Sequence, residues 1–433
     1  MVSDLFSSLE LASGRRLRNR IAKAAMEEGM AGEAQLPDER LISLYRRWGS
    51  GGAGLLITGN VMVDAAALTG PSGVVLDDRA PLEPFRRWAE AGKAGGAAMW
   101  MQINHPGRQV DANMPGVTWA PSSVGVELGR HSKRFGKPVA MTETQIGETV
   151  ERFTSTARLA EQSGFDGVEV HAAHGYLLSQ FLSPRVNRRG DAWGGPLENR
   201  ARLLLDVVRA IRGTVSPSFD VAVKLNSADF QRGGFELEDA RTLIAMLAPL
   251  GVDLVELSGG SYESPAMAGR AADDRTTARE AYFLELATDL AKTSPLPLML
   301  TGGISRRATA ELVLAGGIDV VGMATAMAVT PDLPHRWHKG DEGTKALNPV
   351  TWSDKTLASA ASMALVRHQM RRITLGKDPS ARTRPLFALI SDQRAQRRSR
   401  QRYKLWLETR APGLQTNGAS NQANPRPVLE PNP

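Results

Sequence analysis

Three side chains that can handle protons occur within six residues, at His171, His174 and Tyr176. They come directly after a short apolar run, residues 168–170, which predicts a buried strand. Imidazole and phenol groups donate hydrogen bonds and transfer protons, and barrel enzymes place such groups at the carboxyl ends of their strands. A single histidine is most often structural, but two of them beside a tyrosine favour a catalytic role. We therefore predict that these three residues are catalytic.

The elements that must position these residues alternate along the chain. Eight short apolar runs predict strands, at residues 21–25, 55–58, 98–103, 168–170, 221–225, 254–257, 298–300 and 320–323. Helical patterns lie between them, at residues 38–48, 82–94, 146–162, 197–211, 237–247, 278–290 and 307–314. Strands that alternate with helices favour an α/β fold, and eight such units predict a (β/α)8 TIM barrel.

Two segments add to the predicted barrel. Residues 5–20 alternate loosely around Ser13 and Gly14, and this pattern predicts an N-terminal hairpin. Residues 106–144 carry turn signals without a sustained period, and loops of this length are usually functional. We expect a lid there, with Trp119 and His131 in the wall of the site.

The C-terminal part of the chain is basic. Residues 353–410 contain 14 lysines and arginines against 4 acidic residues, while the whole chain has a net charge of +7. Helical patterns at 355–373 and 385–406 predict a helical basic extension. The basic helix is either solvated or a surface for nucleic acid or another anionic partner. We divide the chain into a barrel at 1–345, the basic extension at 346–410 and a disordered tail at 411–433.

Composition excludes several kinds of site. The chain has no cysteine, so it cannot form a disulfide, a thiolate metal site or a cysteine-ligated iron–sulfur cluster. No apolar stretch approaches the length of a membrane span, and the first residues show no secretory signal. We expect a cytoplasmic protein without a bound metal that acts on a small molecule. A homo-oligomer remains an option.

Four motifs carry a resemblance to a known family. His171-x-x-His174-Gly175-Tyr176 is followed by residues 180–184, Gln-Phe-Leu-Ser-Pro, and by a segment from Asn187 to Arg200. The other three motifs are Leu-Arg-Asn-Arg-Ile at 17–21, Gln-Ile-Asn-His-Pro-Gly-Arg at 102–108 and Thr-Gly-Gly-Ile at 301–304. In this order, and over about residues 1–340, the chain resembles the old yellow enzyme family of FMN-dependent ene reductases.

The resemblance implies FMN as cofactor and NADH or NADPH as co-substrate. It implies that Gln102 contacts the flavin pyrimidine and that Lys224 lies beside flavin N1. Lys224 ends a predicted buried strand, where an unpaired ammonium is costly, so its partner is either the flavin or a barrel carboxylate. Glycines after the last two strands would bind the phosphate through backbone N–H groups. The other cofactor contacts implied are Ala25, Met26, Glu27, Asn60, Gly302, Gly303, Gly322 and Met323.

Four positions depart from the family's pattern. Glu27 stands where relatives have cysteine or threonine, so a carboxylate lies near the flavin. An ionised Glu27 would lower the flavin potential, unless it is protonated or turned away. Gly29 replaces an aromatic lid residue of some relatives, and we expect a more open pocket. Asn60 replaces a small residue, and Met323 replaces an arginine, so the phosphate would depend on main-chain donors.

The resemblance implies an oxidoreductase with ping-pong kinetics. Reduced nicotinamide gives hydride to FMN, and an activated alkene (an enone, enal or nitroalkene) then takes its place. His171 and His174 would hold the substrate oxygen, and Tyr176 would protonate the α-carbon. Two alternatives remain open. One is a flavin barrel that dehydrogenates or demethylates a small molecule, and the other is a barrel with a vestigial flavin that acts through its basic C-terminal helices.

Overall fold

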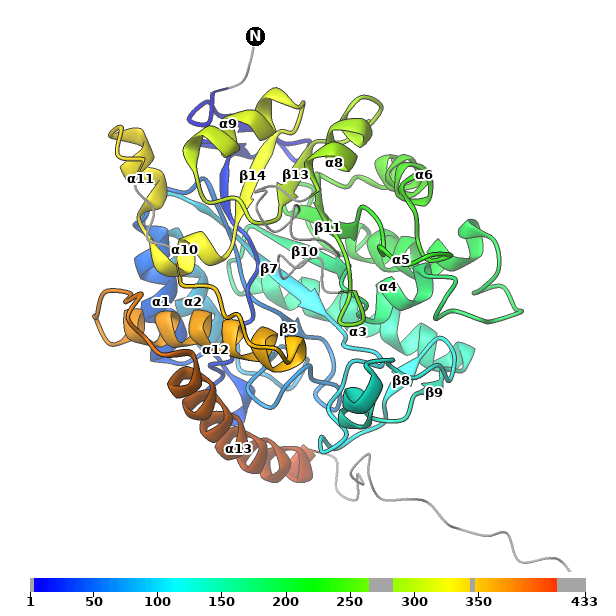
Figure 1. The fold of residues 1–433 in the computed structure, drawn as a ribbon. Coiled ribbons are helices and arrows are strands. Elements are labelled where there is room, and N and C mark those ends of the chain that lie inside the picture. The colour runs from blue at the N-terminus through cyan, green and yellow to red at the C-terminus, as the bar shows by residue number, and fades with distance from the viewer. Residues whose placement is uncertain (1–3, 265–282, 343–346, 411–433) are drawn as a thin grey trace, which may run out of the picture.

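Eight parallel strands close into a barrel in the computed structural model of the chain, which describes residues 4–264, 283–342 and 347–410. The strands are β3 (Ile21–Lys23), β4 (Leu55–Ile57), β7 (Ala98–Asn104), β10 (Gly167–Ala172), β11 (Asp220–Asn226), β12 (Leu254–Ser258), β13 (Leu298–Thr301) and β14 (Val320–Met323). Pairing of β7 with β10 closes the ring (Figure 1). Each predicted strand overlaps one of these, so the (β/α)8 barrel is confirmed.

Helices cover the outside of the barrel. They are α1 (Glu39–Gly49), α2 (Glu83–Lys93), α3 (Glu143–Gln162), α5 (Leu197–Arg212), α6 (Leu237–Leu247), α8 (Leu284–Ala291) and α9 (Arg307–Ala315). Helix α1 shows why they form: Asp38 caps its first turn, and Leu41, Tyr45 and Trp48 make one buried face. Of the helix expected at 278–290, the first five residues lie outside the described part of the chain.

The N-terminal hairpin closes one end of the barrel. Strands β1 (Leu9–Glu10) and β2 (Arg16–Leu17) pair antiparallel, as predicted. In the turn between them, the Ser13 hydroxyl donates to Asp220 Oδ1 (2.5 Å) and the Ser13 backbone donates to Asp253 Oδ1 (2.8 Å). Asp220 begins β11 and Asp253 directly precedes β12. The hairpin therefore binds at the amino ends of the strands and leaves the carboxyl ends for a site.

The side chains inside the barrel form two layers, one polar and one apolar. Trp100 and Leu254 belong to a buried apolar cluster between the strands. Gln102 and Glu256 come two residues later on the same strands, and side chains two residues apart in a strand point to the same side. The polar layer therefore lies nearer the carboxyl ends.

Several short elements carry no clear sequence signal. Strands β5 (Val61–Met62) and β6 (Val74–Val75) extend the sheet beside β7. The predicted lid segment contains β8 (Trp119–Ala120), β9 (Val139–Ala140) and the 3-10 helix η2 (Gly129–Arg134). The remaining short helices are η1 (Glu33–Gln35), α4 (Leu177–Leu182), η3 (Ala248–Leu250), α10 (Thr325–Val329) and α11 (Leu333–His338). Among the helices that the structure describes, none has the length and apolar character needed to cross a membrane.

The C-terminal extension packs on the barrel of its own chain. It consists of α12 (Lys355–Thr374) and α13 (Pro385–Arg410), close to the predicted ranges. Helix α12 lies against α1 and α10 (Figure 1). Helix α13 contacts η1. Tyr403 and Leu407 of α13 are buried against Met62 and Met114, and the Tyr403 hydroxyl donates to the Ala65 carbonyl (2.8 Å). The barrel therefore supplies the apolar surface that α13 needs.

The arginines of α13 fall into two groups. Arg400 lies 3.6 Å from Asp111, and Arg410 lies 2.8 Å from Asp77, so both contact the barrel. The exposed arginines are Arg394, Arg397, Arg398 and Arg402. This exposed group agrees with a solvated helix face.

We expect Leu407→Ala to loosen α13 from the barrel. Leu407 is 3% exposed, and truncation of a buried leucine costs about 2–5 kcal/mol. Hydrogen exchange of residues 385–410 should accelerate while exchange of the barrel strands stays the same. Leu405→Ala is the matched control, because Leu405 is 66% exposed on the same helix. Equal exchange in the two variants would show that this contact does not hold the helix.

Candidate active site

The predicted catalytic residues lie at the carboxyl end of β10. The strand continues to Ala172, so His171 lies on the strand and not after it. His174 (φ 61°) and Gly175 (φ 74°) then adopt the left-handed conformation, which turns the chain into α4. This conformation is uncommon for a residue with a side chain, and it is often found at functional sites.

The turn brings three aromatic rings together. The centroid of the His171 ring lies 5.0 Å from that of His174 and 4.9 Å from that of Tyr176. His171 and Tyr176 are 3% and 5% exposed. His174 is half-buried. The structure thus assembles the three residues selected from the sequence into one cluster, called here the histidine–tyrosine cluster.

Hydrogen bonds orient the two imidazoles. The Ala173 N–H donates to His171 Nδ1 (3.2 Å), so the proton of a neutral His171 ring is on Nε2. His174 Nε2 lies 2.8 Å from Ser258 Oγ, and the backbone N–H of His174 donates to Asn226 Oδ1 (3.1 Å). When Ser258 is the donor, the proton of His174 is on Nδ1. Each ring can then offer one N–H to a ligand.

Both imidazoles are neutral at physiological pH. Burial lowers the pKa of His171 well below its usual value, and the nearby His174 and Lys224 act in the same direction. Burial and Lys224 lower the pKa of His174 to about 3. A neutral imidazole can stabilise negative charge on a ligand by donating a hydrogen bond.

The Tyr176 hydroxyl lies 3.2 Å from the hydroxyl of Tyr262, which follows β12. Burial raises the pKa of Tyr176 well above its usual value, and Tyr262 and Glu27 raise it further. The phenol therefore keeps its proton. Tyr262 was missing from the sequence prediction, although its place after a predicted strand is the same signal that selected Tyr176.

Buried amide atoms of two asparagines at this end of the barrel lack partners within the described part of the chain. Asn104, the last residue of β7, is 1% exposed, and neither of its amide atoms is hydrogen bonded. Asn60 Oδ1 is buried and unpaired as well, and the Asn60 side chain lies beside the Tyr176 hydroxyl. Each unpaired buried polar group costs about 1–3 kcal/mol. A polar ligand between the strand ends would remove that cost.

Gln102 and Lys224 lie in the polar layer of the barrel. Gln102 Nε2 donates to Glu169 Oε2 (2.5 Å), and Lys224 Nζ donates to Glu256 Oε1 (2.6 Å). The barrel carboxylate that the sequence left open as a partner of Lys224 is therefore present. An ammonium has three donors, so this ion pair leaves Lys224 able to bind a second anion.

Glu27 is turned toward the C-terminal extension. Its carboxylate accepts a hydrogen bond from Thr69 Oγ1 (3.2 Å) and lies 3.7 Å from Arg367 of α12. Side-chain nitrogens of Arg367 and Gln396 lie 3.5 and 3.6 Å from the place where a β-carbon at Gly29 would be. The extension therefore fills the space beside Gly29 that we expected to be open.

Four of the remaining predicted cofactor residues are in loops that follow barrel strands. Ala25 and Met26 come after β3 and are half-buried. Gly302 and Gly303 come after β13, and Gly303 has a φ of 69°. These loops are at the same end of the barrel as the histidine–tyrosine cluster.

Gly322 and Met323 lie within β14 and not after it. Met323 is 1% exposed and belongs to the hydrophobic core. A β-carbon at Gly322 would overlap the hydroxyl group of Thr301 on the neighbouring strand. Strand packing therefore accounts for Gly322 without a ligand.

His131 of the predicted lid contacts the extension. It lies 3.7 Å from Asp354, the N-cap of α12. Trp119 packs at the edge of the core. The two residues thus have structural contacts, and their place in the wall of the site stays a prediction.

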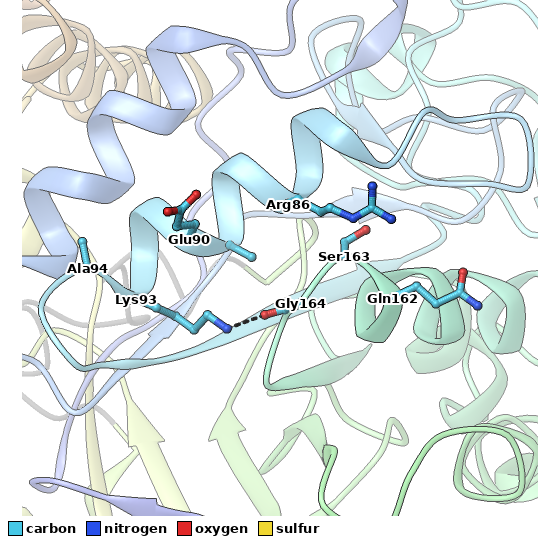
Figure 2. A pocket seen from close by; sticks show the side chains of 8 residues that line it. Arg86, Glu90, Lys93, Ala94, Gln162, Ser163 and Gly164 are labelled. Atoms are coloured by element: carbon cyan, nitrogen blue, oxygen red, sulfur yellow. Dashed lines mark hydrogen bonds between the residues drawn. The ribbon is translucent and has the colours of Figure 1, made fainter.

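A surface hollow of about 500 Å³ lies at the other end of the barrel. Figure 2 shows that side chains from the ends of α2 and α3 line it and that Lys93 Nζ donates to the Gly164 carbonyl (2.6 Å). These segments precede β7 and β10, so the hollow is at the amino ends of the strands. None of the described residues that line it belongs to the histidine–tyrosine cluster.

Sequence comparison identifies relatives of this chain. Residues 4–343 match the family model described as the NADH:flavin oxidoreductase / NADH oxidase family. Over 357 residues the chain is 38% identical to the NADH-dependent flavin oxidoreductase iliE of Hypocrea jecorina, a match that covers 77% of this chain and 89% of that protein.

Solved structures contain the same barrel. The old yellow enzyme homologue from Zymomonas mobilis has a TM-score of 0.66 and 24% identity, over 78% of this chain and 93% of that one. A mutant of morphinone reductase in complex with tetrahydroNAD has a TM-score of 0.66 and 25% identity, over 80% and 93%. Because the family model covers most of the chain, the protein belongs to the NADH:flavin oxidoreductase / NADH oxidase family and is an FMN-dependent enzyme that uses NADH.

Proposed function

We propose that the enzyme reduces the C=C bond of an activated alkene (an enone, enal or nitroalkene) with hydride from NADH or NADPH. The observation that carries this proposal is the histidine–tyrosine cluster, in which two neutral imidazoles lie beside a protonated phenol. Such a cluster can bind an oxygen atom and protonate a carbon near it. Both substrates would bind at this one place, which gives ping-pong kinetics.

The surrounding residues fit FMN. The unpaired amide atoms of Asn60 and Asn104 call for a polar ligand at this end of the barrel. Gln102 would bind the pyrimidine edge, Lys224 the N1 side, and the backbone of Gly302 and Gly303 the phosphate. When bound, FMN supplies hydride transfer from the nicotinamide to the alkene.

His171 and His174 would hold the oxygen of the substrate's carbonyl or nitro group. Negative charge grows on this oxygen when hydride reaches the β-carbon, and hydrogen-bond donors placed in advance stabilise that charge. Neutral imidazoles donate a hydrogen bond to this oxygen and keep their proton. The proton for the α-carbon must then come from another group.

Tyr176 would supply that proton. Its ring lies 4.9 Å from that of His171. Its raised pKa keeps the phenol protonated until a carbanion-like carbon takes the proton. The hydroxyl of Tyr262 lies 3.2 Å from that of Tyr176, and either hydroxyl can donate to the other.

Tyr176→Phe tests this function. The variant keeps the ring and removes the acid, so alkene reduction should slow by about 10²–10⁴-fold. Flavin reduction by NADH should stay nearly normal, and stopped-flow absorbance of the flavin measures the two half-reactions separately. Tyr403→Phe, in α13, is the control variant. Equal slowing of both half-reactions by Tyr176→Phe would rule out the role as proton donor.

A second variant tests the place of FMN. Lys224→Met alone would leave Glu256 buried without its cation, which costs about 3–5 kcal/mol, so we combine it with Glu256→Gln. The double variant should release FMN more readily than Glu256→Gln alone, as measured by the fluorescence of free flavin after dilution. Equal retention of FMN by these two variants would remove Lys224 from the cofactor site.

A further inference from the structure

Lys23 is a buried lysine that the proposed reaction does not use. It ends β3 and is 0% exposed. Its ammonium donates to the Tyr45 hydroxyl of α1 (3.0 Å) and to the Ile57 carbonyl of β4 (2.7 Å). It also lies 4.5 Å from the centre of the Trp48 ring. A buried ammonium is costly unless a negative charge balances it, so an anion is expected close by.

Glu28 supplies this negative charge through Tyr45. Glu28 is 5% exposed, and its carboxylate accepts hydrogen bonds from the Tyr45 hydroxyl and from the backbone N–H of Gly59 (3.0 Å). The Tyr45 hydroxyl thus accepts from Lys23 and donates to Glu28, so it lies between the cation and the anion. Hydrogen bonds to charged groups are stronger than those between neutral groups. Lys23, Tyr45, Glu28 and Gly59 are called here the Lys23–Glu28 network.

Gly59 brings two loops into direct contact. Glu28 is in the loop after β3, and Gly59 is in the loop after β4. A β-carbon at Gly59 would overlap the Glu28 carboxylate and the Met26 carbonyl. Only glycine therefore allows the loops to come so close, and the network joins them at this point.

Cofactor contacts implied by the family resemblance flank this point. Residues 25–27 directly precede Glu28, and Asn60 directly follows Gly59. A change in the distance between Glu28 and Gly59 would therefore move contacts on both loops at once.

The network lies on the outer face of the barrel sheet. Ala22 and Ala24 belong to the apolar cluster between the strands. Lys23 stands between them, and neighbouring side chains of a strand point to opposite faces. Lys23 accordingly points to α1, where Tyr45 and Trp48 lie. The network can therefore act on a ligand of the barrel only by positioning the loops.

The charge of the network depends on pH. Burial lowers the pKa of Lys23 to about 8, although Glu28 raises it. Burial and Glu28 raise the pKa of Tyr45 well above its usual value. Lys23 therefore loses its charge above about pH 8, while Tyr45 keeps its proton. The other groups that act on the pKa of Lys23 are Lys224, which lowers it, and Glu169 and Glu256, which raise it.

We propose that Lys23, Tyr45 and Glu28 are positioning residues for FMN, because their network holds the loops after β3 and β4 at the distance that the cofactor needs. This inference rests on the proposed place of FMN at these loops. When Lys23 is neutral or absent, Glu28 is a buried anion without its cation and turns to solvent or takes a proton. Gly59 then loses its charged acceptor, the two loops separate, and FMN binds more weakly.

The expected pH dependence separates this role from a purely structural one. Burial favours the neutral form of a lysine, so a Lys23 that only supported the fold would not weaken the FMN complex on losing its proton. In the proposed role the complex requires the ammonium, and FMN affinity falls as the pH rises above about 8. Only the positioning role predicts weaker binding of FMN at high pH.

The FMN complex of the wild-type enzyme provides the first test. The dissociation constant is measured from the fluorescence of flavin released at a series of dilutions of the holoenzyme, at pH 7 and at pH 9. If binding requires the protonated form of Lys23, the constant should rise about tenfold between these two pH values. A constant that does not rise would overturn the proposal.

Two variants assign this pH step to the network. Lys23→Met should bind FMN more weakly at pH 7 and should show no step between pH 7 and pH 9. Lys23→Met combined with Glu28→Gln removes both charges and should regain part of the affinity, because a neutral amide accepts the same hydrogen bonds without a cation. A step of wild-type size in Lys23→Met would refute the assignment.

Tyr45→Phe and Tyr403→Phe form a matched pair of variants. Each removes the hydroxyl of a tyrosine that is 0% exposed, and the Tyr403 hydroxyl donates to the Ala65 carbonyl, outside the network. FMN affinity should fall severalfold in Tyr45→Phe and keep the wild-type value in Tyr403→Phe, with the fold checked by circular dichroism. Equal affinities would contradict the role of the network. The measurements use no alkene, so a failure of alkene reduction would count against the proposed function alone.

Discussion

Water is excluded from the interior of the closed barrel, and a charged side chain that a strand directs into it needs a partner there. Lys224 meets this constraint by pairing with Glu256. Glu169 accepts a hydrogen bond from Gln102, and burial raises the pKa of its carboxyl group well above the usual value. The apolar layer and the N-terminal hairpin seal the other end of the barrel. The polar layer is therefore accessible only from the carboxyl ends, where the histidine–tyrosine cluster lies. The electrostatics of the interior and the chemistry of the site are coupled for this reason.

The local sequence pattern was sufficient to predict the strands and helices of the barrel. The runs at 237–247 and 320–323 coincide with α6 and β14, because periodicity and apolar length are properties of neighbouring residues. His171 and Tyr176 are close in sequence, and their rings also lie together in the fold, while their catalytic role stays a prediction. The partners of the buried charged side chains were not predictable. The pairing of Glu256 with Lys224 depends on the register of β11 and β12, which a local sequence pattern does not contain.

Glu27 illustrates the same limit. The sequence marked its carboxylate as unusual, but its partner Arg367 comes from α12, far along the chain. Arg367 also lies 2.9 Å from Asp392, which in turn lies 2.5 Å from Arg371. The four groups alternate in charge, so Arg367 partly offsets the charge of Glu27. The basic extension thus compensates an acidic residue of the barrel.

The position of the extension also fixes the order in which the protein can be completed during translation. Arg367, Tyr403 and Arg410 contact Glu27, Ala65 and Asp77, which belong to the first part of the chain to leave the ribosome. The loops after the first two barrel strands therefore stay uncovered until the last helix has been synthesised. A nascent chain would therefore present the loop at Gly29 without the Arg367 and Gln396 side chains that lie beside it in the complete protein.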